Sequence, residues 1–226
     1  MQEERFAVAF AEMALDLSDG AGEAETVDRV TEYALHSVGC DYAGVMLVHR
    51  HQHIEVAAST DPLVAKIEQL QLDFGEGPCM AAITQHDSFL VNDTRTDDRW
   101  PQWAAQVATL GVRSVLSVRL FTRQTDLGSL NLFALQPDAF DHDDDAVAHI
   151  LAQHASVALA AARQESTLWQ AIDARKLIGQ AQGILMERFD LTAEDAFSVL
   201  RRYSQDNNVK LREVAQRLLD TRQLPR

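Results

Sequence analysis

The chain has 226 residues, of which 46% are hydrophobic and 24% charged, and its formal net charge is −14. This composition is typical of a globular protein, and the length favours two domains. The sequence shows no membrane span, no signal-peptide core at its start and only two cysteines, Cys40 and Cys79, which excludes a disulfide framework and a metal-binding cysteine motif. We therefore expect a cytoplasmic protein with no membrane partner.

The charge is divided unequally along the chain. Residues 166–226 contain ten Lys and Arg against eight Asp and Glu, a net charge of +2, whereas residues 1–165 carry −16. A strongly acidic protein is a poor partner for nucleic acid, but such asymmetry indicates separate roles for the two segments. Only the C-terminal segment is a candidate for binding a polyanion.

The first 137 residues alternate between helical and strand-like patterns. Apolar residues three and four apart predict helices, and β-rich runs bounded by turn residues predict strands. The expected elements are helices over 5–19 and 23–38, antiparallel strands over 42–50 and 53–60, a helix over 62–72, a Gly/Pro-rich loop over 74–79, a strand over 88–93, a helix within 97–111, and a hairpin of strands over 112–123 and 127–137. One run of helices and strands thus ends near Pro137.

A proline-free, alanine-rich run predicts one long helix over about residues 141–189. Asp141 caps its start, and the acidic residues that follow favour the helix dipole. A helix of this length is typical of a coiled coil or of a connector between domains.

Two shorter helices are predicted after it, over 192–205 and 209–222. Thr192 and Asp195 resemble a capping box at the start of the first. Three short helices bury little surface, so this part is expected to pack as a dimer or against its neighbour. Its predicted core consists of Ile178, Ala181, Leu185, Ala196, Leu200, Val214 and Leu218.

The end of the long helix carries positive charge, amides and bare backbone on adjoining faces. The residues are Arg175, Gly179, Gln182 and Met186, with Lys176, Gln180 and Gly183 beside them, and Arg201, Arg202, Lys210 and Arg212 near the second break. Such a surface suits contacts to phosphates and unpaired bases. The alternative is that these residues are ordinary solvated surface charges.

The run from Ala174 to Leu219 resembles the ANTAR domain, the RNA-binding output module of bacterial transcription antiterminators. The similar segments are IGQAQGILMER, DAFSVLRRYSQ and NVKLREVA, in that order. The resemblance implies binding to paired RNA hairpins in nascent transcripts, usually as a homodimer. It assigns RNA contact to Arg175, Lys176, Gln180, Gln182, Arg188, Arg201, Arg202, Lys210 and Arg212. Gln182 stands where the family often has Lys, so one positive contact is absent.

The order of elements in the preceding part resembles a GAF domain. The resemblance implies an α+β fold, with a mixed antiparallel sheet flanked by helices and a small-molecule pocket. The similar segments are FGEGPC at 74–79, VNDTRTDDRWPQW at 91–103 and GVRSVLSVRLFTRQTDLGSLNLF at 111–133. We therefore expect a GAF sensor domain over 1–162 and an ANTAR domain over 163–226. Together they imply a signal-responsive antitermination regulator with an unidentified GAF ligand.

Several residues allow more than one interpretation. Cys79 is either a reactive thiol or a small packing residue, and packing is favoured. Trp100 and Trp103 either line the mouth of a pocket or pack a helix onto the sheet, and packing is again favoured. The alternating His49, His51 and His53 straddle a turn and are not expected to bind metal, and the acidic run at 141–145 lacks the glycine pattern of a calcium loop.

An enzymatic function is not expected. The chain has no G-x-S-x-G, Walker or H-E-x-x-H motif. Some GAF relatives reduce free methionine sulfoxide, but that requires a set of nearby cysteines, so neither catalysis nor a cofactor is expected. Two further functions stay open, a DNA-binding regulator and a dimerisation scaffold that binds no nucleic acid.

Overall fold

The computed structural model describes residues 11–17, 19, 22–49 and 52–223. Residues 11–17 are helical, and the remainder of the helix expected over 5–19 lies largely outside the described residues. The other elements are α2 (Glu23–Ser37), β1 (Tyr42–Val48), β2 (Ile54–Ser59), α3 (Pro62–Phe74), α4 (Pro78–Gln85), β3 (Phe89–Val91), α5 (Pro101–Thr109), β4 (Ser114–Phe121), β5 (Asp126–Ala134), α6 (His142–Phe189), α7 (Ala193–Asp206) and α8 (Leu211–Thr221).

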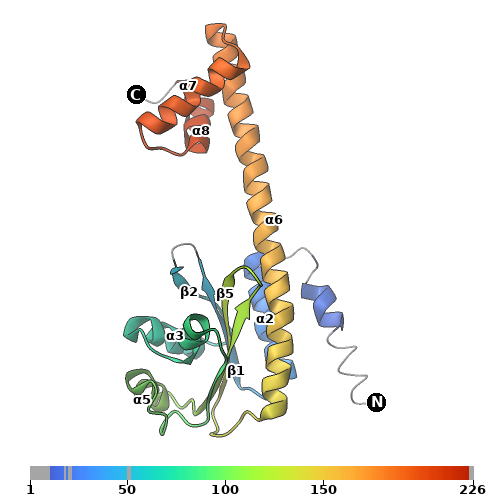
Figure 1. The fold of residues 1–226 in the computed structure, drawn as a ribbon, viewed down its shortest axis with the longest axis vertical. Coiled ribbons are helices and arrows are strands. Elements are labelled where there is room, and N and C mark those ends of the chain that lie inside the picture. The colour runs from blue at the N-terminus through green and yellow to red at the C-terminus, as the bar shows by residue number, and fades with distance from the viewer. Residues whose placement is uncertain (1–10, 18, 20–21, 50–51, 224–226) are drawn as a thin grey trace. The chain divides into compact units, whose positions relative to one another are not determined.

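The chain divides into two compact units, Met1–Arg163 and Gln164–Arg226. The long helix α6 runs without interruption from the first unit into the second (Figure 1). Its start is capped as expected, because Oδ1 of Asp141 accepts hydrogen bonds from the backbone N–H groups of Asp143 and Asp144 at 2.8 and 3.0 Å. These bonds lower the pKa of Asp141. No helix in the described part of the chain is long and apolar enough to cross a membrane.

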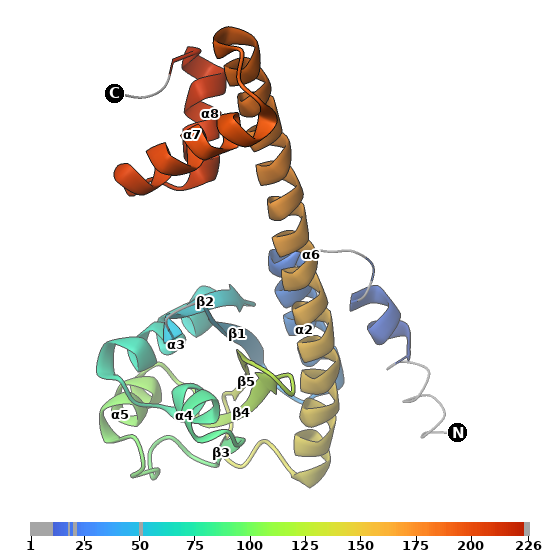
Figure 2. The ribbon, with the colours of Figure 1, turned by 45° about the horizontal axis from the view of Figure 1, so that its top comes forward.

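The first unit has three layers built on a five-stranded sheet. The strand order is β2-β1-β5-β4-β3, and every pairing is antiparallel, in agreement with the expected antiparallel sheet flanked by helices. Helix α2 and the first half of α6 pack on one face, and α3, α4 and α5 lie on the other (Figure 2). Because both faces are covered, β5 is almost wholly buried. Trp100 and Trp103, the two tryptophans of the first unit, are buried in the core between the sheet and helices α3 and α5, as expected.

Helix α4 is absent from the predicted elements, because the glycines and proline around it indicate a loop over 74–79. In the structure the loop is confined to residues 75–77. Gly75 ends α3 in the left-handed conformation, at a φ of 68°, and Pro78 occupies the first turn of α4. Proline suits that position because its fixed φ matches a helix and its missing N–H would be unpaired there. Gly77 between them has a φ of 142°, and a Cβ there would lie 2.2 Å from Oε1 of Gln71.

The second unit consists of the end of α6 with α7 and α8, packed around one small core. Six of the seven expected core residues are buried, Ile178 is only partly buried, and Ala215 joins them. Thr192 caps α7 by accepting from the backbone N–H of Asp195 at 3.2 Å, and its hydroxyl donates to the Asp195 carboxylate at 2.6 Å. The two short helices thus end α6 in a compact helical unit.

Candidate nucleic-acid interface

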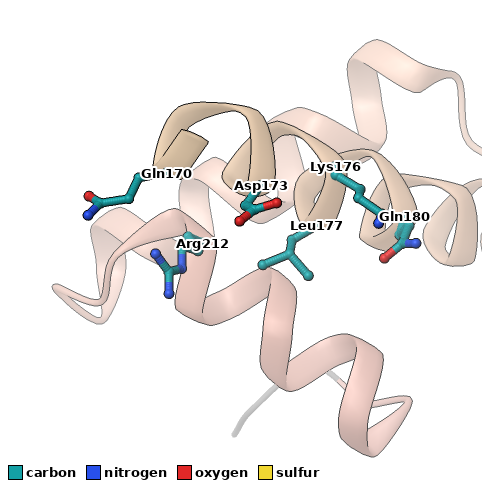
Figure 3. A pocket seen from close by; sticks show the side chains of 6 residues that line it. All are labelled: Gln170, Asp173, Lys176, Leu177, Gln180 and Arg212. Atoms are coloured by element: carbon teal, nitrogen blue, oxygen red, sulfur yellow. The ribbon is translucent and has the colours of Figure 1, made fainter. Parts of the chain in front are cut away.

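A groove of about 540 Å³ lies between α6 and α8 in the second unit (Figure 3). Three of the nine expected RNA-contacting residues line it, namely Lys176 and Gln180 on α6 and Arg212 on α8. The remaining lining residues are Gln170, Asp173 and Leu177. The structure therefore brings the lysine and the two amides of α6 together with an arginine from α8, a separate segment of the sequence.

Helical spacing explains how α6 presents its side of the groove. Asp173, Lys176 and Gln180 are separated by three and four residues, so they lie on one side of the helix. Leu177 is packed against the core beside them and forms the apolar floor. Arg212 stands in the first turn of α8, and the packing of α8 on α6 places it across the groove.

The polar side chains of the groove are accessible to solvent, and its two cations are not engaged in ion pairs with other described residues. Lys176, Gln180 and Arg212 are exposed. Neither cation forms an ion pair with another residue in the part of the chain that the structure describes. Lys and Arg supply N–H donors for phosphate oxygens, and a glutamine amide both donates and accepts. Asp173 is the only acidic residue in the lining and limits the groove's positive charge.

A second groove of about 720 Å³ continues along the same two helices and shares Leu177 and Gln180 with the first. It is further lined by Gly183, Ile184 and Glu187 of α6 and by Gln216, Leu219 and Arg222. A Cβ at Gly183 would meet no atom within 4 Å, so the packing of this unit does not require glycine there. Gln180 therefore lines both grooves, and Gly183 exposes the helix backbone beside it.

Two expected RNA-contacting residues are engaged in the unit's own structure. Nε2 of Gln182 donates to the backbone oxygen of Ala193 at 2.9 Å. The guanidinium of Arg188 donates to the backbone oxygen of Arg222 at 2.5 Å. Gln182 thus joins α6 to the start of α7, and Arg188 joins it to the end of α8. Neither lines the groove.

The other four expected residues are exposed but lie outside the lining of both grooves. Arg175 belongs to α6, and Arg201 and Arg202 belong to α7, where Arg202 lies 3.6 Å from the Asp206 carboxylate. Lys210 is the residue that precedes α8. The sequence interpretation missed Gln170 and Asp173, although their spacing from Lys176 and Gln180 is the signal that would have found them.

The first unit contains both cysteines and the three alternating histidines. Cys79 is fully buried, and burial raises its pKa, as expected of a packing residue. Cys40 is only partly buried, and burial raises its pKa to about 12. His49 lies 2.6 Å from the Glu55 carboxylate, and His51 lies outside the described residues. Within the described ranges, no three His, Cys, Asp or Glu side chains are grouped to hold a metal.

Comparisons with known proteins separate the same two parts of the chain. The family model of the GAF domain matches residues 20–160, and that of the ANTAR domain matches residues 166–219. Comparison with curated proteins yields no significant match.

Solved structures resemble the first part. The GAF domain of a phosphoenolpyruvate-protein phosphotransferase from Coxiella burnetii is 15% identical, with a TM-score of 0.58 over 70% of this chain and 94% of that one. The free methionine-R-sulfoxide reductase of Neisseria meningitidis, solved with its substrate, is 19% identical, with a TM-score of 0.56 over 69% and 89%. A domain of a sensor histidine kinase protein from Sinorhizobium meliloti 1021 is 13% identical, with a TM-score of 0.52 over 63% and 94%.

At these identities the structural matches show the fold alone, whereas the GAF model covers more than half of the chain. The GAF match and the ANTAR match follow one another without overlap. The chain therefore belongs to the GAF domain family and carries an ANTAR domain after it, the architecture of a regulator with a sensor domain.

Proposed function

We propose that this protein is a signal-responsive, RNA-binding regulator of transcription antitermination that acts in the cytoplasm. In this proposal the groove between α6 and α8 contacts hairpin RNA in nascent transcripts. The observation that carries it is the convergence of Lys176, Gln180 and Arg212 on one exposed groove of the ANTAR domain. The protein acts by binding and not by catalysis.

The groove supports two kinds of contact. Lys176 and Arg212 are suited to phosphate oxygens, which position a nucleic acid without reading its sequence. Gln170 and Gln180 are suited to the edges of unpaired bases in a hairpin loop, where sequence-specific RNA recognition takes place. Asp173 repels phosphate and so favours a path along the groove that keeps the backbone near the two cations.

An exposed apolar stripe along α6 supports a homodimer. Ile150, Val157, Leu168 and Ile172 are 40%, 70%, 60% and 45% exposed. They follow one another at intervals of 7, 11 and 4 residues, which keeps them on one side of a helix. A second copy of α6 covers this stripe in a coiled coil, and the resulting dimer presents two grooves to a pair of hairpins.

Control by the GAF domain requires that its ligand favours one packing of the α6 pair over another. A ligand shifts such an equilibrium only by its difference in affinity for the two states. The continuity of α6 through both units supports this role, because the same helix carries the GAF core residue Leu159 and the groove residue Lys176. In this proposal the signal is transmitted through α6.

The test is binding of the full-length protein to a two-hairpin RNA over a salt series. The Lys176→Ala/Arg212→Ala variant is compared with Arg201→Ala/Arg202→Ala, which removes the same charge from α7. Losing two phosphate contacts should lower the slope of log K against log salt by about 1.4 to 1.8, and only in the groove variant. Equal losses in both variants would place binding elsewhere on the unit.

The same assay separates RNA binding from the two rival functions. A DNA-binding regulator would prefer duplex DNA of equal length in competition with the hairpin RNA. A dimerisation scaffold would bind neither nucleic acid at any salt concentration. If the full-length protein binds no RNA, the assay is repeated with residues 164–226 alone. RNA binding by this isolated unit would indicate that the GAF domain inhibits it in the full-length protein, and no binding would indicate a dimerisation scaffold.

A further inference from the structure

A group of polar side chains is buried in the first unit between the sheet and helix α3. Glu68 of α3 and Ser129 and Asn131 of β5 are all fully buried. Nδ2 of Asn131 donates to Oε1 of Glu68 at 2.7 Å. Ser129 and Asn131 are two residues apart on one strand, so their side chains point to the same face of the sheet, the face that Glu68 contacts.

Each of these three side chains has an unused oxygen. Oε2 of Glu68, Oγ of Ser129 and Oδ1 of Asn131 have no hydrogen-bond partner among the residues that the structure describes. A buried polar atom without a partner costs about 1–3 kcal/mol, and more if it is charged. Three such atoms on neighbouring side chains therefore indicate that something beyond the described side chains satisfies them.

The backbone around Glu68 is shaped to admit its carboxyl. Gly44 of β1 is paired in register with Asn131, and a Cβ at Gly44 would lie 2.6 Å from Oε1 of Glu68. On the other side of Asn131 the register places Ser117, whose hydroxyl lies 3.4 Å from the sulfur of Cys79. The carboxyl thus occupies space that a side chain at position 44 of β1 would fill, and Asn131 donates a hydrogen bond to it there.

The chemistry of the unused atoms specifies the ligand. An amide oxygen accepts only, a hydroxyl accepts or donates, and an ionised carboxylate accepts only. No cation among the described residues compensates Glu68, and burial raises its pKa to about 8, with the Asn131 hydrogen bond opposing that rise. A ligand with a positive charge and several N–H donors could donate to these oxygens and would stabilise Glu68 in its ionised form.

We propose that Glu68, Ser129 and Asn131 form a binding site for a small ammonium ligand, either the ammonium ion or a short primary ammonium. This inference rests on the proposed function only in treating the GAF domain as a sensor, for which it names the signal. It is tested by ligand binding without RNA, so a negative result here and a negative RNA-binding result are separate outcomes.

The experiment measures the unfolding midpoint and the binding heat of the full-length protein at constant ionic strength. Sodium chloride is replaced stepwise by potassium, ammonium, methylammonium or tetramethylammonium chloride. We expect saturable stabilisation by ammonium or methylammonium, because a ligand that binds only the folded state raises its stability with concentration. Potassium and tetramethylammonium carry the same charge without N–H donors and should have no saturable effect.

The same titrations distinguish the free ammonium ion from an organic amine as the ligand. Saturation by ammonium at lower concentration than by methylammonium identifies the free ion, and the reverse order identifies an organic amine. The proposal is overturned if no N–H cation gives saturable stabilisation, or if potassium does so equally. The three oxygens would then be satisfied by buried water, which commonly bridges such groups.

Two variants and a control localise the effect. Glu68→Gln keeps the shape but removes the charge and should abolish saturation. Ser129→Ala removes a hydroxyl that has no hydrogen-bond partner among the described residues. It should therefore weaken binding about tenfold without lowering the unfolding midpoint in sodium chloride. Glu32→Gln makes the same charge change at an exposed position of α2 and should bind like the unaltered protein. Retained saturation in Glu68→Gln would overturn the site.

Discussion

Gln182 and Ala193 join the long helix to the helix that follows it. The side-chain amide of Gln182 donates a 2.9 Å hydrogen bond to the backbone oxygen of Ala193, the first residue of α7. This oxygen belongs to the first turn after the chain reverses direction. A residue assigned to RNA contact by resemblance therefore also maintains the fold of the unit.

Replacing Gln182 by alanine should lower the free energy of unfolding of the second unit by about 1 kcal/mol, the usual net contribution of such a hydrogen bond. Chemical denaturation of residues 164–226 measures this value. RNA affinity at temperatures where the unit stays folded should change little. A large affinity loss without a stability loss would instead show that Gln182 contacts RNA directly.

Replacing Gly179 or Gly183 by alanine should stabilise the second unit by about 1 kcal/mol each, because alanine costs less than glycine within a helix. A Cβ at either position meets nothing within 4 Å, so no clash offsets the gain. Urea unfolding of the two single variants measures it. A loss of stability at either position would indicate that another helix lies against that backbone.

Replacing Val157 and Leu168 by glutamate should convert the proposed dimer to a monomer, since both side chains are well exposed within one chain. The helical content should remain, because neither residue packs in a core of its own chain. Sedimentation velocity at several concentrations measures the change. Ser166→Glu, which introduces a charge on the opposite side of α6, is the matched control and should remain dimeric.

The stability of the first unit should fall as pH rises from about 4 to 8. The pKa of Glu68 is raised from its ordinary value to about 8 by burial, so the folded protein retains a proton that the unfolded chain has released. The free energy of unfolding then decreases by up to about 1.4 kcal/mol per pH unit in this window and levels off above it. Denaturant midpoints across the window measure the slope.

The variant Glu68→Gln has no proton to release at this position, so its slope over the same window should be smaller. Glu32→Gln, at an exposed position, should retain the full slope. An unchanged slope in Glu68→Gln would mean that other groups govern the pH dependence of this unit.

Local pattern was enough to predict most elements. The apolar spacing in α6, α7 and α8 correctly indicated their extents to within a few residues, and the capping residues Asp141 and Thr192 marked two of their starts. Helix α4 was missed because a glycine followed by a proline is typical both of a loop and of the start of a helix. The packing of Gly77 against Gln71, which distinguishes the two, is a tertiary contact.

The candidate sites depended on the tertiary structure. In α3 the polar residues Glu68 and Gln71 stand at the same helical spacing as the apolar Val64 and Ile67, which is a signal that they are buried, but not of what they face. Likewise, the sequence identified Lys176 and Arg212 as exposed cations without showing that they share a groove. Periodicity determines which side of a helix is buried, whereas the partner across a groove is determined by how distant segments pack, a property that no local pattern contains.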